Sequence, residues 1–263
     1  MVLTLACAQF APVGGDVNAN VARMAKLLRE AAGADLVVFP ELATTGYLPG
    51  AEVAPLAEPI PGPTTERLSA LARECRIAIA TGIAELDPAS GRRYNTLVVV
   101  DSDGRLCLRY RKTHLWAGEE RWATPGSSFT VAQCGGVALG AWICYDCRFP
   151  EVARMFALAG AEVALVGSAW LGPAEEWELA VRARAMDNGI FVAASTMQGT
   201  SGSMEFHGGS LIADPHGRVI AQAREGETTV IAAKADLAAI PECRARLPLL
   251  SHRRRDLYSP LVV

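Results

Sequence analysis

Short apolar runs alternate with amphipathic segments along the chain, and this order restricts it to folds that combine strands with helices. Residues 3–9 are a short apolar run, and apolar side chains at helical spacing follow it. Asp16 is a suitable N-cap for this helix, and Gly33 closes it. Residues 35–39 (DLVVF) then form a second apolar run of strand length. A strand, a helix and a second strand in this order predict a crossover connection.

The same order recurs further along the chain. PTTERLSALARECR predicts a capped helix with the strand IAIATGI after it, while NTLVVVD and LCLRY flank the turn SDG and predict a hairpin. In the second half the predicted helices are one opened by Pro150 and AEEWELAVRARAMDN. The predicted strands are VALGAWI, VALV, IFVAAS, GGSLIAD, VIAQA and TTVIAAKAD. No Ser/Gly linker or fixed-period repeat divides the chain, so we expect a single α/β domain over residues 1–263 with a mixed sheet system.

Composition excludes several classes of protein. The chain has 263 residues, 51% of them hydrophobic, which suits a compact enzyme with a substantial core. A net charge of −3 provides no global positive field for a nucleic acid or an anionic membrane. No uncharged apolar stretch approaches the ~20 residues needed to cross a bilayer. Seven dispersed cysteines form no disulfide framework, so we expect a cytoplasmic protein. From the charge and the absence of a long apolar stretch we expect no nucleic-acid or membrane partner.

Three chemically reactive side chains stand at points where predicted strands end. Glu41 follows DLVVFP, Lys112 follows LCLRYR, and Cys144 follows VALGAWI. In open α/β sheets, ligands bind beyond the carboxyl ends of the strands. A carboxylate can take the proton of a thiol, and an ammonium favours the thiolate and stabilises an oxyanion. Each residue alone has a structural explanation, as a buried cysteine or a surface charge, but together they fit a nucleophilic mechanism.

Cys144 and Cys147 also form a C-x-x-C motif, which leaves other interpretations open. A zinc site needs a second pair of cysteines or histidines, and the chain offers none, so we expect no metal. A dithiol redox pair would leave Glu41 and Lys112 without roles. A cysteine–histidine pair with His114 is a further alternative, although support of the site or core packing suits His114 better. No glycine-rich nucleotide-binding motif follows a strand.

Five segments in order resemble the carbon-nitrogen hydrolase, or nitrilase-like, superfamily, and together they span nearly the whole chain. They are FPELATTGY, YRKTHLW, ICYDCRFPE, GPAEEWELAVRARAMDN and RLPLLSHRRRDLY. The resemblance implies a four-layer α-β-β-α sandwich in which Cys144 is the nucleophile, Glu41 the general base and Lys112 the group that stabilises the tetrahedral intermediate. It also implies a homodimer or a higher even homo-oligomer formed through helices, including the helix after Cys144 and the RARAMDN helix.

The family often has a second glutamate shortly after the lysine, which helps to position the substrate. Two neighbours compete for this role here, Glu119 and Glu120. Counting back from the turn at Pro125 favours Glu119, by similarity to family members with a short loop. The alternative is that Glu119 is only a charged residue of a solvated loop.

The resemblance also indicates a branch of the superfamily. Enzymes that hydrolyse nitriles usually carry Trp-Glu after the nucleophile, whereas here Tyr145 and Asp146 follow it, as in amidases. The sequence is most similar to Nit-type amidases, which act on ω-amides of small dicarboxylic acids or on deaminated glutathione. Arg148 then pairs either with a substrate carboxylate or internally with Glu151. Ala169 stands where many relatives have Asn, and the loop of the second glutamate is shorter than in ω-amidases, so the identity of the amide stays open.

We therefore expect an amidase that hydrolyses a small carboxamide through a cysteine thioester without a cofactor. The expected oxyanion donors are Lys112 and the backbone N–H of Tyr145, and the expected pocket walls include Tyr47, Trp116 and Trp170. Three alternatives remain. They are an N-carbamoyl hydrolase, an acyltransferase with the same three catalytic residues, and a catalytically silent binding protein on this fold.

Overall fold

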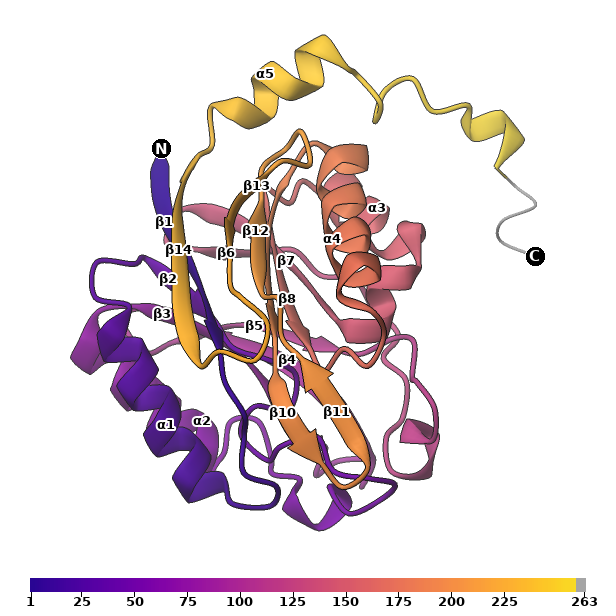
Figure 1. Cartoon of the computed structure of the whole chain (residues 1–263). Helices are drawn as coiled ribbons and strands as arrows, with labels where there is room; N and C mark the ends of the chain where they lie inside the picture. The colour runs from indigo at the N-terminus through magenta and orange to yellow at the C-terminus, as the bar shows by residue number, and fades with distance from the viewer. Residues whose placement is uncertain (259–263) are drawn as a thin grey trace.

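The computed structural model describes residues 1–258 and shows two six-stranded sheets packed face to face. Helices α1 (Val17–Glu30) and α2 (Pro63–Cys75) cover the outer face of the first sheet, and α3 (Pro150–Leu158) and α4 (Ala174–Asn188) cover the second (Figure 1). The layers therefore follow the order α-β-β-α. This confirms the fold that the resemblance implies.

The strands divide into two large sheets and one hairpin. The first sheet has the order β14-β1-β2-β3-β4-β5, with bounds Thr229–Asp236, Val2–Gln9, Leu36–Val38, Ala78–Leu86, Arg93–Val100 and Leu106–Arg111. The second has the order β13-β12-β9-β8-β7-β6, with bounds Val219–Gln222, Leu211–Ala213, Phe191–Thr196, Val163–Ser168, Val137–Ile143 and Ala132–Cys134. The hairpin consists of β10 (Gln198–Ser201) and β11 (Met204–His207).

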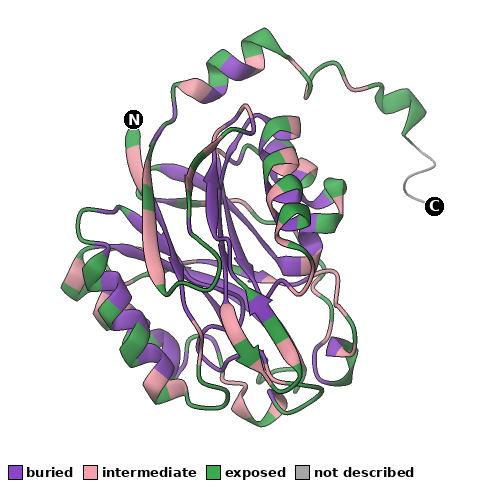
Figure 2. Cartoon of the chain, in the orientation of Figure 1, coloured by how far each residue is buried: buried purple, intermediate pink, exposed green. Residues whose placement is uncertain are grey.

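The strand pairings follow the predicted connections. β1 and β2 are parallel and joined across α1, and β7, β8 and β9 are parallel in turn, as crossover connections require. β4 and β5 form the predicted antiparallel hairpin. Alternation along β1 explains how the layers hold together, because Leu5 and Cys7 belong to the core shared by the two sheets, whereas Ala6 and Ala8 pack toward α1 and α2. Figure 2 shows the central strands of both sheets as buried, whereas β13 and β14 are partly exposed.

Four elements escaped the sequence analysis. Strand β6 has only three residues, β10 and β11 are rich in polar residues, and α5 (Ala239–Arg246) buries only Ile240 and Cys243. None of them carries the strong periodicity on which the other predictions depend.

The expected single domain stays a prediction, and residues 259–263 of its range lie outside the described part of the chain. Within residues 1–258, no helix has the length and apolar character needed to span a membrane.

Two glycines let the turn after β2 enter the space at the ends of both sheets. A Cβ on Gly82 in β3 would lie 2.1 Å from the backbone nitrogen of Leu42, and one on Gly167 in β8 would lie 3.1 Å from that of Glu41. Only glycine permits the first of these approaches without a backbone shift. The fold thereby buries the backbone of Glu41 between the two sheets.

Candidate active site

The structure brings Glu41 and Lys112 together at the ends of strands of the first sheet. Glu41 follows β2, and Lys112 directly follows β5. Lys112 Nζ lies 2.8 Å from Glu41 Oε1, and both side chains have 0% exposure. Cys144 directly follows β7 of the second sheet and is also buried, with both Glu41 and Lys112 close enough to affect its pKa. The three predicted side chains therefore meet where the two sheets face each other.

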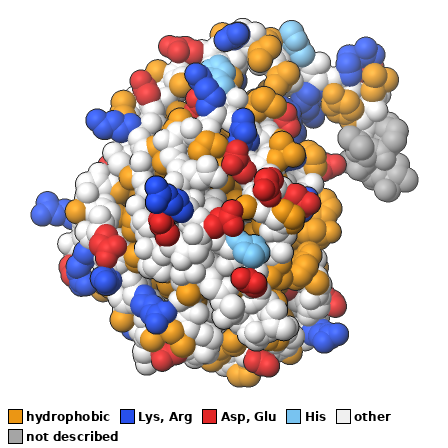
Figure 3. All heavy atoms as spheres, in the orientation of Figure 1, with side chains coloured by type: hydrophobic (Ala, Val, Ile, Leu, Met, Phe, Trp, Pro, Cys, Tyr) orange, Lys and Arg blue, Asp and Glu red, His pale blue; other side chains and the backbone are white. Residues whose placement is uncertain are grey.

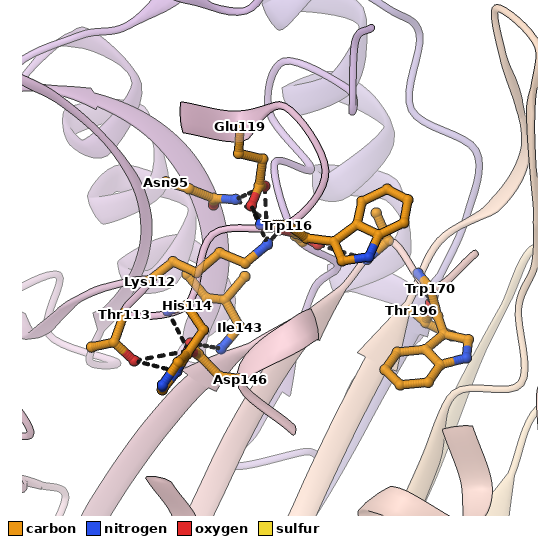
Figure 4. Close-up of polar contacts among 12 residues, drawn as sticks. Asn95, Lys112, Thr113, His114, Trp116, Glu119, Ile143, Asp146, Trp170 and Thr196 are labelled. Carbon is orange, nitrogen blue, oxygen red and sulfur yellow. Dashed lines mark hydrogen bonds and ion pairs between the residues drawn. The ribbon is translucent and has the colours of Figure 1, made fainter. Parts of the chain in front are cut away.

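Glu119, and not Glu120, joins this cluster. Lys112 Nζ donates to Glu119 Oε1 at 2.9 Å and lies 2.7 Å from Oε2. The backbone N–H of Trp116 donates to Glu119 Oε2 at 2.8 Å, which fixes the second carboxylate oxygen. The exposed Glu120 instead accepts a hydrogen bond from the backbone of its own loop. The loop therefore turns Glu119 inward, toward Lys112 (Figure 4), and leaves Glu120 exposed to solvent.

Asn95 is part of the same cluster, and the sequence analysis missed it. Its Nδ2 donates to Glu41 Oε1 at 2.7 Å and to Glu119 Oε1 at 3.0 Å, so one amide holds both carboxylates. Figure 4 shows the contact between Asn95 and Glu119. The second oxygen of Glu41 accepts from the backbone N–H of Ala169 at 2.9 Å. The signal in the sequence is an amide at the head of the apolar run NTLVVVD, and the structure shows that this amide is fully buried in β4.

Burial sets the protonation of the cluster at rest. It raises the pKa of Glu41, an effect that the nearby Lys112 ammonium and the Asn95 hydrogen bond only partly oppose. Burial disfavours the Lys112 ammonium, but Glu41 and Glu119 outweigh this and hold the pKa of Lys112 well above its ordinary value. Burial and the Glu41 charge raise the pKa of Cys144, with Lys112 opposing them. The resting site therefore holds a protonated thiol beside an ammonium.

A second buried carboxylate, Asp146, connects the lysine loop to the cysteine turn. Asp146 accepts hydrogen bonds from Tyr110 Oη at 2.7 Å, Thr113 Oγ1 at 2.8 Å and the backbone N–H of His114 at 2.9 Å. It also accepts from the backbone N–H of Ile143 at 3.1 Å, immediately before the nucleophile (Figure 4). The carboxylate thus fixes two chain segments relative to each other, a role that the motif around it did not reveal.

His114 faces this carboxylate. Its Nδ1 lies 2.8 Å from Asp146 Oδ1, and its ring stacks on Phe149 with 3.7 Å between ring centroids. The expected supporting position of His114 agrees with these contacts. Cys144 begins a 3₁₀ turn over Cys144–Arg148 and has a φ of 45°, in the left-handed region that non-glycine residues rarely adopt. The Asp146 contacts therefore hold a strained turn in place.

Cys147 does not form a reactive pair with the candidate nucleophile. Burial raises the pKa of Cys147 to about 12, whereas a redox dithiol needs an accessible thiolate. Among the residues that the structure describes, no three His, Cys, Asp or Glu side chains are grouped so that they could hold a metal ion.

A cavity of about 470 Å³ opens beside Cys144. Its lining residues are Trp116, Cys144, Tyr145, Arg148, Ala169, Trp170, Leu171 and Gly172. Four of the five predicted substrate-binding residues therefore share one cavity with the thiol. The fifth, Tyr47, is buried against Phe206, with ring centroids 6.0 Å apart, and lines a neighbouring cavity of about 50 Å³ together with Trp116 and Glu119.

Arg148 has an internal partner, but not the one considered from the sequence. Its guanidinium pairs with Glu176 at the start of α4 instead of Glu151, and it stacks on Trp170 with its carbon 4.6 Å from the ring centroid. Among the described residues that line the 470 Å³ cavity, Arg148 is the one with a charge. The structure thus presents this cation already neutralised.

Comparison with known proteins agrees with this geometry. A sequence model of the carbon-nitrogen hydrolase family matches residues 4–245, and the chain belongs to this family. The chain is 41% identical to the omega-amidase NIT2 of Xenopus tropicalis over 257 residues, which are 91% of this chain and 91% of that protein. A carbon-nitrogen hydrolase structure from Helicobacter pylori has a TM-score of 0.91 at 26% identity, with 100% of this chain and 99% of that chain covered.

A third relative shows covalent chemistry at a cysteine. The structure of an amidase variant from Nesterenkonia sp. AN1 has covalent addition of the acetamide moiety of fluoroacetamide at the active-site cysteine. It has a TM-score of 0.86 and 26% identity, with 98% of this chain and 96% of that chain covered. Together the comparisons confirm the predicted superfamily and fold, and they bear out the expected amidase with a cysteine nucleophile.

The burial of Glu41 generates a pH prediction. Glu41 can accept a thiol proton only as a carboxylate, so its raised pKa places the acid limb of kcat/KM above the range of an exposed glutamate. Asn95→Leu removes a donor that favours the carboxylate, and we expect the acid limb to move to higher pH. The measurement is kcat/KM across pH for the variant and the wild type.

Thr96→Val is the matched control on the same strand. Thr96 Oγ1 donates to Glu85 at 2.6 Å, away from the cluster, so its loss lowers stability without moving the acid limb. An acid limb at the same pH in Asn95→Leu and wild type contradicts the assigned role of Glu41.

Proposed function

We propose that this protein is an amidase that hydrolyses small carboxamides, with Cys144 as nucleophile, Glu41 as general base and Lys112 as the oxyanion-stabilising cation. The observation that carries the proposal is the buried ion cluster of Glu41, Lys112 and Glu119 beside a thiol that lines a cavity. A carboxylate that touches an ammonium while both lie next to the thiol supplies a base and a positive charge to the same reaction.

The first stage forms a thioester. Glu41 takes the proton of Cys144, and the thiolate attacks the amide carbon. The oxyanion binds Lys112 and the backbone N–H of Tyr145, which follows the nucleophile and lines the cavity. The protonated Glu41 then gives its proton to the amide nitrogen, the carbon–nitrogen bond breaks and ammonia leaves.

The second stage restores the enzyme. Glu41 takes a proton from water, the resulting hydroxide attacks the thioester, and the acid leaves as Cys144 regains a proton. Glu119 supports both stages because it accepts a second hydrogen bond from Lys112 and keeps the lysine charged. No step needs a metal or an organic cofactor.

The reaction is tested by replacing the nucleophile. We expect Cys144→Ala to lower kcat for ammonia release by more than about 10³-fold, because no other group can form the thioester. Cys147→Ala, a change three residues away that removes a buried thiol, is the control and should retain kcat within about threefold. Ammonia release by Cys144→Ala at a rate near that of the wild type contradicts the mechanism.

The pairing of Arg148 bears on the class of amide. A neutral carboxamide enters the cavity with the Arg148–Glu176 pair intact, whereas an ω-amide such as succinamate must bring its carboxylate to an arginine that Glu176 already holds. We propose small neutral amides as the preferred substrates and ω-amides as weaker ones. The 41% identity to an omega-amidase makes ω-amides the alternative to test.

Glu176→Gln separates these substrates. We expect kcat/KM for succinamate to rise about 3- to 10-fold, because the free guanidinium can bind the carboxylate, while kcat/KM for butyramide changes by less than about twofold. Glu175→Gln removes the neighbouring exposed carboxylate and serves as the matched control. A wild type that prefers succinamate, with no gain in Glu176→Gln, contradicts the proposal.

We also propose a homodimer built on α3 and α4, in the cytoplasm. Both helices expose apolar side chains, with Leu179 67%, Met186 50% and Met155 47% accessible. Figure 3 shows hydrophobic side chains gathered on the side of the molecule that carries these helices, and Figure 1 shows the chain after α5 reaching past them. A patch of this kind supports a subunit contact. The seven free cysteines support a reducing compartment.

Leu179→Glu tests the dimer. We expect sedimentation velocity to show the monomer mass at concentrations where the wild type sediments as a dimer, because the charge would be buried in the contact. Leu106→Glu, at the far edge of the first sheet, introduces the same charge elsewhere and should leave the dimer intact. Equal masses for all three proteins contradict the assigned face.

A further inference from the structure

Two cysteines outside the active site face each other across the edges of the two sheets. Cys107 lies on β5, the last strand of the first sheet, and Cys134 lies on β6, the last strand of the second. Their Sγ atoms are 2.9 Å apart, although the residues are 27 positions apart in sequence. No backbone pairing joins β5 to β6, so these side chains are a direct contact between the open edges of the sheets.

The two thiols differ in accessibility. Cys134 is buried against the core shared by the sheets, while Cys107 is half-buried and can be reached from solvent. The hydrogen bond between the two thiols lowers the pKa of Cys107. An accessible thiolate beside a buried second thiol is the arrangement in which a mixed disulfide forms on one sulfur and is resolved by the other.

We propose that Cys107 and Cys134 are a dithiol site that closes to a disulfide across the sheet edges when the protein meets a small disulfide such as oxidised glutathione. The Cys107 thiolate attacks one sulfur of oxidised glutathione, breaks its S–S bond and releases one glutathione thiolate. The released glutathione thiolate takes the proton of Cys134, and the Cys134 thiolate attacks Cys107 Sγ, which forms the intramolecular bond, breaks the mixed disulfide and releases the second glutathione. Two protein thiols are oxidised, and one glutathione disulfide is reduced to two thiols.

The position of the site gives the disulfide a structural effect. The loop it closes, from Cys107 to Cys134, carries both Lys112 and Glu119. The bond constrains this loop in the unfolded chain and ties the two sheets at an edge that side-chain packing alone holds closed. The sulfur atoms already lie within contact distance, so closure requires little displacement of the strands. Oxidation therefore stabilises the protein without altering the catalytic cluster.

The test treats the full-length protein with oxidised glutathione and maps its peptides without reduction. We expect a peptide that links Cys107 to Cys134, no retained glutathione on Cys107, and a melting temperature about 5–10 °C higher than that of the reduced protein. Cys134→Ser should retain one glutathione on Cys107 and show no such rise. Cys75→Ser, which removes a half-buried thiol on α2, should behave like wild type.

The result separates this site from ordinary thiol oxidation. A wild type that retains glutathione on Cys107 without the linked peptide overturns the proposal, as does a linked peptide with no rise in melting temperature. An equal rise in Cys134→Ser overturns it as well. These readouts do not depend on amide hydrolysis, so a failure of the amidase mechanism would leave them unchanged.

Discussion

The arrangement of the site depends on a lysine that is buried between two glutamates. Moving a charged group out of water costs several kcal/mol per ion, so three buried ions persist only where hydrogen bonds replace the lost solvent. Here Lys112 donates to both carboxylates, and Asn95 bridges them from the adjacent strand. Backbone N–H groups of Trp116 and Ala169 satisfy the remaining oxygens. This set of partners comes from four separate segments, which must all be in place before the charges are stable.

The face-to-face packing of the sheets provides those segments. The first sheet supplies the carboxylate and the ammonium from the ends of β2 and β5, and the second supplies the thiol from the end of β7. Gly82 and Gly167 allow the Glu41 backbone to approach from both sides. Asp146 then fixes the loop after β5 to the turn after β7, which holds the ammonium and the thiol at a constant separation. The face-to-face packing of the two sheets thus brings their strand ends together at the active site.

The sequence predicted the residues whose chemistry is local and missed those whose role arises from contacts between strands. Glu41, Lys112 and Cys144 were identified because each stands where an apolar run ends, a rule that needs no knowledge of neighbours. Asn95 is 54 residues from Glu41, and nothing in the run NTLVVVD shows which face of the sheet its side chain occupies. The partner of Arg148 was misjudged for the same reason, since Glu176 is 28 residues away and Glu151 only three. Strands β6, β10 and β11 were missed because short or polar strands lack periodicity.

The raised pKa values of the acid and the nucleophile are compatible with catalysis because the two shifts oppose each other in the proton transfer. Burial disfavours the anionic form of both Glu41 and Cys144, so moving a proton from the sulfur to the carboxylate exchanges one disfavoured anion for another. The net charge of the site does not change in this step, and Lys112 stays cationic beside whichever anion is present. The buried cluster therefore keeps the thiol protonated at rest and makes the thiolate accessible only through Glu41.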